Sequence, residues 1–223
     1  MSLQARKNAL RKVLSTRDLT EIRGWAVSER NPLRMLFSFT YDPDELIRWR
    51  AVEAIGLVAG DQANTNLDKV RDVIRHLLWL MNDESGGLSP LAPEMIGEIL
   101  VNVPSLIEEY GPLLPSFLQE EPFVRGSHLA IWRVAMVRPG VFGDAIEQFR
   151  LSLVDTDPAV RAYAARTIMA IDMVQSEGIK MQLCRDDASF SFYEFESGKL
   201  RHTTVARMIS CQSDCDTNSE RAA

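Results

Sequence analysis

The sequence predicts an all-α protein, a right-handed α-α superhelix of helix pairs that ends in a small C-terminal β-hairpin. A motif with an acidic start and apolar residues at helical spacing recurs along the chain. From Asp187 onward this helical period gives way to strand-like alternation. One helix pair cannot bury its own apolar face, so the recurring pairs are expected to stack into one continuous core.

The recurring motif is clearest in residues 42–56 and 155–164, where aspartate and proline precede the apolar positions. An aspartate side chain accepts a hydrogen bond at a helix start, and proline presets the backbone angle there. Fainter copies around Ile22, Ala92 and Val124 bring the number of indicated second helices to five. The helices that precede and partner them are expected at 33–40, 67–81, 105–118 and 141–154.

These segments resemble the HEAT-like (armadillo-type) helical repeat family, whose second helix typically reads Asp-x-Asp-x-x-Val-Arg-x-x-Ala. The match is close in the two clearest copies and partial elsewhere, with Ser89 in place of the arginine and His128 in place of the alanine. The resemblance covers about residues 3–172 and implies an α-solenoid of about five helix pairs over residues 1–178. It implies little about function, because such repeats serve many unrelated roles.

Residues 179–209 form a second predicted unit, a β-hairpin followed by a short helix that caps the array. The strand, the turn and the return strand are expected at 189–195, 196–199 and 200–203. Thr204 is then expected to cap a helix that runs to Ile209.

The hairpin carries three phenylalanines, Phe190, Phe192 and Phe195, that are too apolar to remain in water. We expect them to cover the end of the array beside Ile168, because the linker after Asp172 is too short to reach the far end. Docking on a second copy of the protein, and hence a homodimer, stays open as an alternative.

Two segments outside the helices are weak candidates for binding. The acidic loop at 82–87 has two glycines and could hold a cation or a basic side chain of a partner, but Asp83 more simply caps the next helix. The tail, residues 210–223, is predicted to be disordered. Its Cys211 and Cys215 lack a second Cys or His pair and make a poor zinc site, so the sequence indicates no role for them.

Aligning the copies separates a core side of the second helices from an opposite, concave side. Ile55, Ile96, Trp132 and Ile168 share one core row, so all four are expected to be buried. On the concave side few positions are charged and many are small or apolar, which is typical of an interaction surface. The alternative is that strong curvature makes the second helices bury one another. The predicted partner-binding residues are Trp49, Glu53, Glu94, Glu98, Arg133, Arg166 and Met169.

Three carboxylates, those of Glu53, Glu94 and Glu98, are expected to converge on one concave patch. Paired carboxylates can do acid/base work or hold a metal, but a solvated acidic patch balanced by arginines is the favoured interpretation. His128 is expected to be a buried, hydrogen-bonded histidine. No histidine is followed by glutamate, as a HEAT-like metalloenzyme resembling deoxyhypusine hydroxylase would require, so no metal or cofactor is expected.

Composition limits the function classes. The 223 residues carry 25 Lys+Arg against 31 Asp+Glu, a net charge of −6, which disfavours nucleic acid as a partner. No apolar run suits a membrane span or a signal peptide, so a cytoplasmic location without membrane contact is expected. The sequence favours a non-enzymatic scaffold that binds a protein or peptide through its concave face. The alternative is a nucleic-acid enzyme resembling the HEAT-like alkylpurine DNA glycosylases, which would need a basic concave face.

Overall fold

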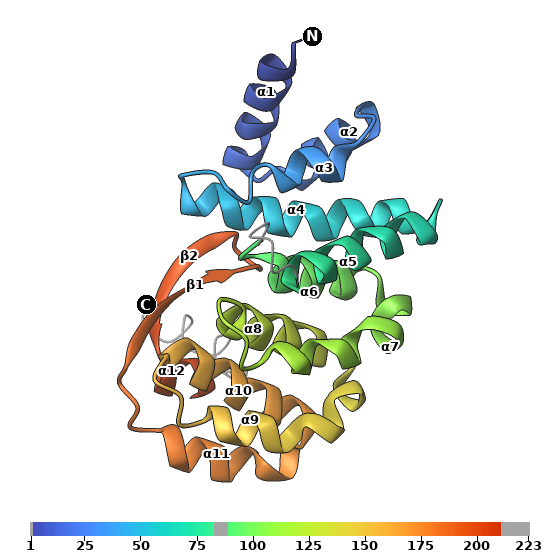
Figure 1. The fold of residues 1–223 in the computed structure, drawn as a ribbon. Helices are drawn as coiled ribbons and strands as arrows, with labels where there is room; N and C mark the ends of the chain where they lie inside the picture. Colours follow the sequence, from blue (N-terminus) through green and yellow to red (C-terminus); the bar gives the residue numbers. More distant parts are fainter. Residues whose placement is uncertain (1, 83–88, 211–223) are drawn as a thin grey trace, which may run out of the picture.

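The computed structural model describes residues 2–82 and 89–210, and helices make up most of this part of the chain (Figure 1). Over those residues the chain forms twelve α-helices, short 3₁₀ turns and one two-stranded antiparallel sheet. The mainly helical architecture and the small C-terminal hairpin are therefore as the sequence predicts. No helix of the described part is both long and apolar enough to cross a membrane. The predictions for the 82–87 loop and the tail fall, apart from Asn82 and Ser210, outside the described residues.

The α-helices follow one another along the chain as α1 (Leu3–Thr16), α2 (Leu19–Ser28), α3 (Pro32–Phe37), α4 (Glu45–Ala63), α5 (Leu67–Met81), α6 (Ala92–Asn102), α7 (Ile107–Tyr110), α8 (Val124–Ala135), α9 (Ile146–Ser152), α10 (Pro158–Ile171), α11 (Ser176–Leu183) and α12 (Val205–Ser210). The strands are β1 (Ser189–Glu194) and β2 (Lys199–Thr204). Turns of 3₁₀ helix lie at Pro104–Leu106, Gly111–Phe117, Pro139–Ala145 and Met173–Gln175.

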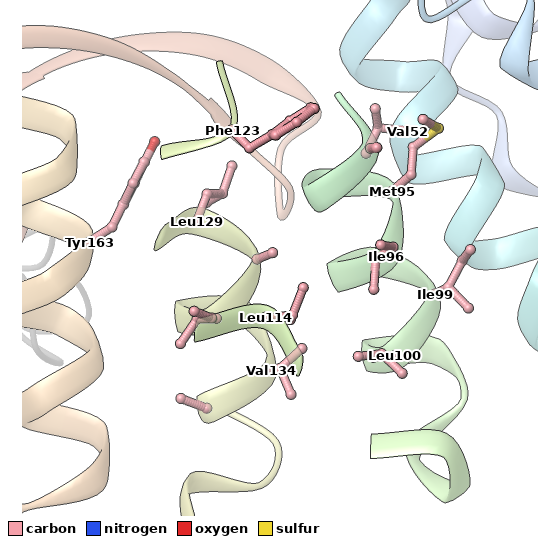
Figure 2. Close-up of a cluster of buried hydrophobic side chains, with 14 of the residues drawn as sticks. Val52, Met95, Ile96, Ile99, Leu100, Leu114, Phe123, Leu129, Val134 and Tyr163 are labelled. Carbon is pink, nitrogen blue, oxygen red and sulfur yellow. The ribbon is translucent and has the colours of Figure 1, made fainter. Parts of the chain in front are cut away.

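Four helices, α4, α6, α8 and α10, pack side by side in chain order and form the inner row of the fold. In Figure 1, α1 to α3 precede this row and α11 follows it at the opposite end. Apolar side chains fill the space between neighbouring helices of the row, as Figure 2 shows for Ile96 and Leu100 of α6 and Val134 of α8. Four of the five predicted second helices are thus the helices of the inner row.

The starts of α4 and α10 share one local structure, which the Asp-x-Asp motif encodes. The first aspartate, Asp42 or Asp155, accepts from the main-chain N–H two residues on, at 3.0 and 2.8 Å. The second aspartate, Asp44 or Asp157, is the N-cap and accepts from an N–H of the first helical turn. The capping role expected of Asp42 therefore belongs to Asp44, whereas Asp157 caps α10 with Pro158 at its first position, as predicted.

Three residues of the predicted core row are fully buried, each with an exposed fraction of 0%: Ile55, Ile96 and Ile168. The fourth, Trp132, is only partly buried, so that prediction is wrong in its detail. Phe123, the N-cap of α8, and Ile131 within this helix are both buried and have the same spacing as Ile47 and Ile55 in α4. The fourth copy of the repeat is therefore one residue out of register with the alignment.

Two of the partner helices differ from the continuous helices expected at 105–118 and 141–154. The first is the short α7 between two 3₁₀ segments, and the second is α9 after a 3₁₀ turn. Pro115 lies inside the first region and removes a main-chain N–H donor, so a regular α-helix cannot continue through it. Gly140 and Gly143 weaken the α-helix in the second region. The helix expected at 67–81, by contrast, is α5.

The hairpin follows the predicted pattern closely. β1 pairs with β2 antiparallel along its whole length. Gly198 in the connecting turn has a φ of 66°, in the left-handed region that favours glycine. The hydroxyl of Thr204 accepts from the main-chain N–H of Arg207 at 3.3 Å and so caps α12. The expected boundary at residue 178 falls inside α11, and the change from helix to strand comes only after that helix.

The strands of the hairpin run back along the inner row from α10 to α4, and of the hairpin and its short helix only α12 lies beside α11 at the α10 end (Figure 1). Val205 and Ile209 of α12 are buried where it packs on α10 and α11. The expectation that the strands themselves cover the end beside Ile168 is therefore wrong. That expectation considered only the length of the linker after Asp172. A strand of six residues extends the chain by about a further 20 Å at roughly 3.3 Å per residue.

The close packing of the inner row predicts that even a methyl group added at one of its glycines destabilises the protein. A Cβ on Gly56 would lie 2.7 Å from the main-chain oxygen of Glu98, and one on Gly97 would lie 2.8 Å from Cα of Ala130. We expect Gly56→Ala and Gly97→Ala each to lower the free energy of unfolding by about 1–3 kcal/mol, because backbone cannot move aside cheaply. Urea denaturation followed by circular dichroism measures this.

Gly24→Ala in α2 is the matched control, because nothing lies within 4 Å of its added Cβ. It is expected to leave stability unchanged or to raise it by up to about 1 kcal/mol through helix propensity. Equal stability of all three variants would show that the inner row is not packed as described.

Candidate functional site

The hairpin lies on the side of the inner row that the sequence predicts as concave and partner-binding. We name this surface the inner face and define it by Trp49, Glu53, Glu94, Glu98, Trp132, Arg133 and Tyr163. Phe190, Tyr193 and Phe195 are buried against it, with exposed fractions of 5%, 2% and 9%. Every residue of β2 is exposed or only partly buried, so β1 faces the helices and β2 faces outward.

Aromatic contacts hold the tip of the hairpin on α4 and α8. The rings of Trp49 and Tyr193 are stacked, with centroids 5.7 Å apart and an interplanar angle of 4°. Phe195 meets the Tyr193 ring edge-on at 5.0 Å. The guanidinium of Arg133 lies over the Phe195 ring at 4.2 Å from its centroid, a cation–π contact. One strand end thus lies between an aromatic ring of α4 and a cation of α8.

Arginines from three helical regions bind the main chain of the hairpin. Each donates from its guanidinium to a carbonyl oxygen, in the pairs Arg17 with Phe195, Arg50 with Gly198, and Arg125 with Ser191. These bonds are independent of hairpin side chains. The inner face therefore holds an extended segment both by its main chain and by its rings.

Glu53 is the polar centre of these contacts. Its carboxylate accepts two bonds from Arg17, at 2.7 and 2.9 Å, and a third from the hydroxyl of Tyr193 at 2.7 Å. Burial, followed by the bond to this carboxylate, raises the pKa of Tyr193, so the hydroxyl stays protonated and donates. A carboxylate with three donors is a fixed structural anchor.

Glu98 and Arg133 form a bidentate ion pair in the packed layer between α6 and α8. Nε of Arg133 donates to Oε1 of Glu98 at 2.7 Å, and Nη2 donates to Oε2 at 3.1 Å. Only 3% of Glu98 is exposed, and burial raises its pKa while Arg133 opposes that effect. Removing one partner would leave the other charge buried without compensation.

Glu94 differs from the other two carboxylates, because it has no arginine bound to it. It is 7% exposed, and its Oε2 atom has no hydrogen-bond partner among the described residues. Burial raises the pKa of Glu94 to about 7, against smaller opposing effects of its own main-chain N–H and the charge of Arg125. Near neutral pH this carboxyl group is therefore divided between its charged and neutral forms.

Glu94 lines a pocket of about 310 Å³ at the N-terminal ends of α4, α6 and α8, which we name the Glu94 pocket. Its lining is Glu45, Arg48, Trp49, Pro90, Leu91, Glu94, Pro122, Arg125, Gly126, Leu129, Tyr163 and Ser191. Figure 2 shows Leu129 and Tyr163 at this end of the helices, close to the hairpin strands. The volume suits a side-chain-sized group, at the lower end of the range of ligand sites.

Gly126 makes room for the carboxyl group of Glu94. A Cβ at this position would lie 2.5 Å from Oε2 of Glu94. The carboxyl group thus lies against the first turn of α8, where the helix dipole favours negative charge.

The predicted site residues therefore share a surface but not one role. The expected patch of Glu53, Glu94 and Glu98 is not solvated, because Glu94 and Glu98 are buried and Glu53 is bound by Arg17 and Tyr193. The expected balance by arginines holds for Glu53 and Glu98. The alternative that these carboxylates hold a metal finds no support in residues 2–82 and 89–210, where no group of three or more metal-ligating side chains occurs.

The remaining predicted residues lie at the α10 end of the row. Arg166 has its guanidinium 5.5 Å from the centroid of Trp132, and Met169 is buried at 2% exposure. His128 is 1% exposed, and its ring nitrogens lie 2.8 Å from the carbonyl oxygen of Val124 and 2.8 Å from the hydroxyl of Ser152. The prediction of a buried, hydrogen-bonded histidine is confirmed.

Several residues of the site were missed by sequence reasoning, chiefly Arg17, Arg125, Tyr163 and Tyr193. Strict alternation of residues 189–195 marks the strand, but it places Tyr193 beside Phe195 and opposite Phe190 and Phe192. It therefore does not predict that Phe190 and Tyr193 are both buried against the helices. Arg17 follows α1 with a φ of 55°, a left-handed conformation that no local motif signals. Its partner Glu53 lies 36 residues away in sequence.

Comparison with known proteins adds one relative. No family model matches the chain, and no solved structure matches it. The chain is similar to an uncharacterized protein of Archaeoglobus fulgidus, with 29% identity over 168 residues, which is 73% of this chain and 85% of that protein. The name of this relative carries no functional statement.

The hairpin contacts predict that Tyr193 stabilises the site. We expect Tyr193→Ala to lower the free energy of unfolding by on the order of 3 kcal/mol, since the stack on Trp49 and the bond to Glu53 are both lost. Amide hydrogen exchange of residues 189–204 is expected to accelerate. Leu200→Ala is the control, because Leu200 pairs with Tyr193 in the register but is 36% exposed. Equal effects of the two changes would contradict the described placement of β1.

The raised pKa of Glu94 predicts that the stability of the protein depends on pH. This pKa is about 7 in the folded protein and about 4.3 in an unfolded chain, so the folded state binds more protons between these values. The stability of the native protein therefore falls as pH rises through this window, whereas Glu94→Gln, which is neutral throughout, lacks this loss.

We expect the free energy of unfolding of Glu94→Gln, measured by urea denaturation, to rise relative to that of the native protein between pH 5 and pH 8. This rise should be on the order of 2 kcal/mol, because one pKa unit corresponds to about 1.4 kcal/mol. Taking the difference between the two proteins cancels the titration of other groups. A difference that is constant with pH would mean that Glu94 is ionised like an exposed carboxyl group.

Proposed function

We propose that the protein is a non-enzymatic, HEAT-like repeat scaffold, a right-handed α-solenoid that binds a protein partner through the inner face and the hairpin on it. The observation that carries this proposal is that the inner face already binds an extended segment of polypeptide. It does so with arginine donors to main-chain carbonyls and with stacked rings. These are general means of holding a peptide. The packing of α4, α6, α8 and α10 in chain order supports the solenoid form.

The partner is expected to meet β2. In the described part of the chain, the sheet contains only β1 and β2, so the outer edge of β2 pairs with no further strand. Lys199, Leu200, Arg201 and His202 are all exposed there. An open strand edge accepts an extended segment of another protein through main-chain hydrogen bonds, and flanking charges limit which segments pair.

The scaffold is favoured over an enzyme resembling the alkylpurine DNA glycosylases. Such an enzyme would need an aromatic residue and a carboxylate open to a nucleobase. Trp49 is stacked on Tyr193 and Trp132 on Tyr163, so neither ring is free on both faces to hold a nucleobase, and the carboxylate between them, Glu94, is only 7% exposed. The net charge of −6 also gives little attraction to phosphates.

Site-specific photo-crosslinking tests the proposal. A photoreactive residue is placed at His202 of β2 and, as a control, at Gln182 of α11, which is also exposed. In cells of the native organism we expect one protein to be crosslinked from position 202 and not from position 182. The purified pair is then expected to form a complex in sedimentation.

The same crosslinked proteins from both positions, or none from position 202, would contradict a partner site on the hairpin. Titration with duplex DNA completes the test, because the scaffold is expected to show no affinity at physiological salt. Binding that weakens as salt rises would favour the nucleic-acid enzyme instead.

A further inference from the structure

The Glu94 pocket is lined by two arginines and two carboxylates, and both arginines already donate to acceptors of the chain itself. Arg48 donates to the main-chain oxygens of Asp42 and Pro43, at 2.9 and 3.3 Å. Arg125 donates to the carbonyl of Ser191, has a hydrogen bond with the hydroxyl of Tyr163, and lies 3.9 Å from Asp157. Both guanidinium groups are thus bound to acceptors of the chain itself. The remaining charged groups of the lining are the acceptors Glu45 and Glu94.

The unsatisfied group in the pocket is an acceptor with a defined position. Oε2 of Glu94 is buried without a partner in the described part of the chain, although a buried carboxylate oxygen is normally hydrogen-bonded. Gly126 leaves no side chain between this oxygen and α8. A cationic group in the pocket therefore gains by lying against this carboxyl group and compensating its charge.

The walls of the pocket suit an alkyl chain that carries a charged end. Trp49 and Tyr163 supply aromatic rings, and Leu91, Leu129 and Pro122 supply apolar surface. An ammonium or guanidinium group near an aromatic face gains a cation–π attraction, and its alkyl stem is buried on apolar surface. An anion with the same alkyl stem would lack the cation–π attraction, would face two carboxyl groups, and would meet arginines that already donate to the chain.

We propose that the Glu94 pocket binds a cationic N–H donor, an alkylammonium or guanidinium group, presented by a lysine or arginine side chain of the protein partner. The source of this group rests on the proposed function, but the chemistry of the pocket does not. The pocket opens beside Ser191 of β1, so a partner on the hairpin lies within reach of it.

Proton release distinguishes this mode of binding. The cation binds the charged form of Glu94, whose pKa without ligand is about 7. The titratable and charged groups that face it are Arg48 and Glu45 of α4, Arg125 of α8, and Tyr163 and Asp157 at α10. We attribute the pH dependence of binding to Glu94, and the Glu94→Gln variant tests this assignment. Affinity is expected to rise about tenfold between pH 6 and pH 8, as the charged fraction of Glu94 rises.

Calorimetric titration with n-butylammonium chloride tests the proposal on the full chain. We expect binding to the native protein, with close to one proton released at pH 6, measured from buffers of different ionisation enthalpy. Glu94→Gln keeps the shape of the side chain and should weaken binding at least tenfold and abolish the proton release. Gly126→Ala should weaken binding as well, because its methyl group displaces the carboxyl group of Glu94. Gly24→Ala, with open space around its Cβ, should bind like the native protein.

Sodium butyrate serves as the anionic probe of equal size. Binding of butyrate in preference to butylammonium, equal binding of butylammonium to Glu94→Gln, or no binding to the folded native protein would each overturn the proposal. These outcomes do not depend on any partner, so they are separate from failure of the crosslinking test.

A second arm identifies the source of the cation. A short peptide with one central lysine, its amino terminus acetylated and its carboxyl terminus amidated, is compared with butane-1,4-diammonium. Tighter binding of the peptide, with loss of the crosslink at position 202 in Glu94→Gln, supports a side chain of the partner. Tighter binding of the free diammonium ion, with the crosslink unchanged, would overturn the partner as the source.

Discussion

The close approach of the helices in the inner row is the constraint on which the rest of the structure depends. Gly56, Gly97 and Gly126 stand where a Cβ would clash with the next helix. Helices packed in this way have axes about 8–10 Å apart, so three steps from α4 to α10 cover about 24–30 Å. A hairpin with strands of six residues and a turn spans nearly this distance at about 3.3 Å per residue. The spacing of the helices therefore decides that one short hairpin can contact the whole row.

The same close packing explains why the carboxylates of the inner face have different environments. Glu98 lies in the layer between α6 and α8, where Arg133 compensates its charge. Glu94 lies one helical turn earlier, where the facing residue of α8 is Gly126 and no basic side chain bonds to it in the part described. A buried carboxylate with a bound arginine forms a structural ion pair, whereas a buried carboxyl group without such a partner can be satisfied by a ligand. Sequence spacing alone treats the two residues as equivalent.

Local signals in the sequence predicted the helices and strands, but they could not predict contacts between residues far apart in the sequence. Periodicity gave α5 at its exact bounds and Asp157 as a cap, because both depend on neighbours within one or two turns. The alignment failed at Trp132, since one inserted residue rotates a helix by about 100° without disturbing its period. The hairpin covers part of the inner face, but Tyr193 lies 140 residues from Glu53, and no pattern within the chain links them.

The energetics of the hairpin favour a partner that adds to it over one that replaces it. A two-stranded hairpin is marginal in water, so its order derives from the contacts of Phe190, Tyr193 and Phe195 with the helices. Three such side chains bury on the order of 150 Å² each, which at about 25 cal/mol per Å² is worth several kcal/mol as an upper estimate. A competitor for the inner face would have to supply these contacts again and also satisfy Glu53. A segment that pairs with β2 leaves them in place and gains its own hydrogen bonds. The inner face and the hairpin therefore act as one surface, with β2 as its outer edge and the Glu94 pocket beside it.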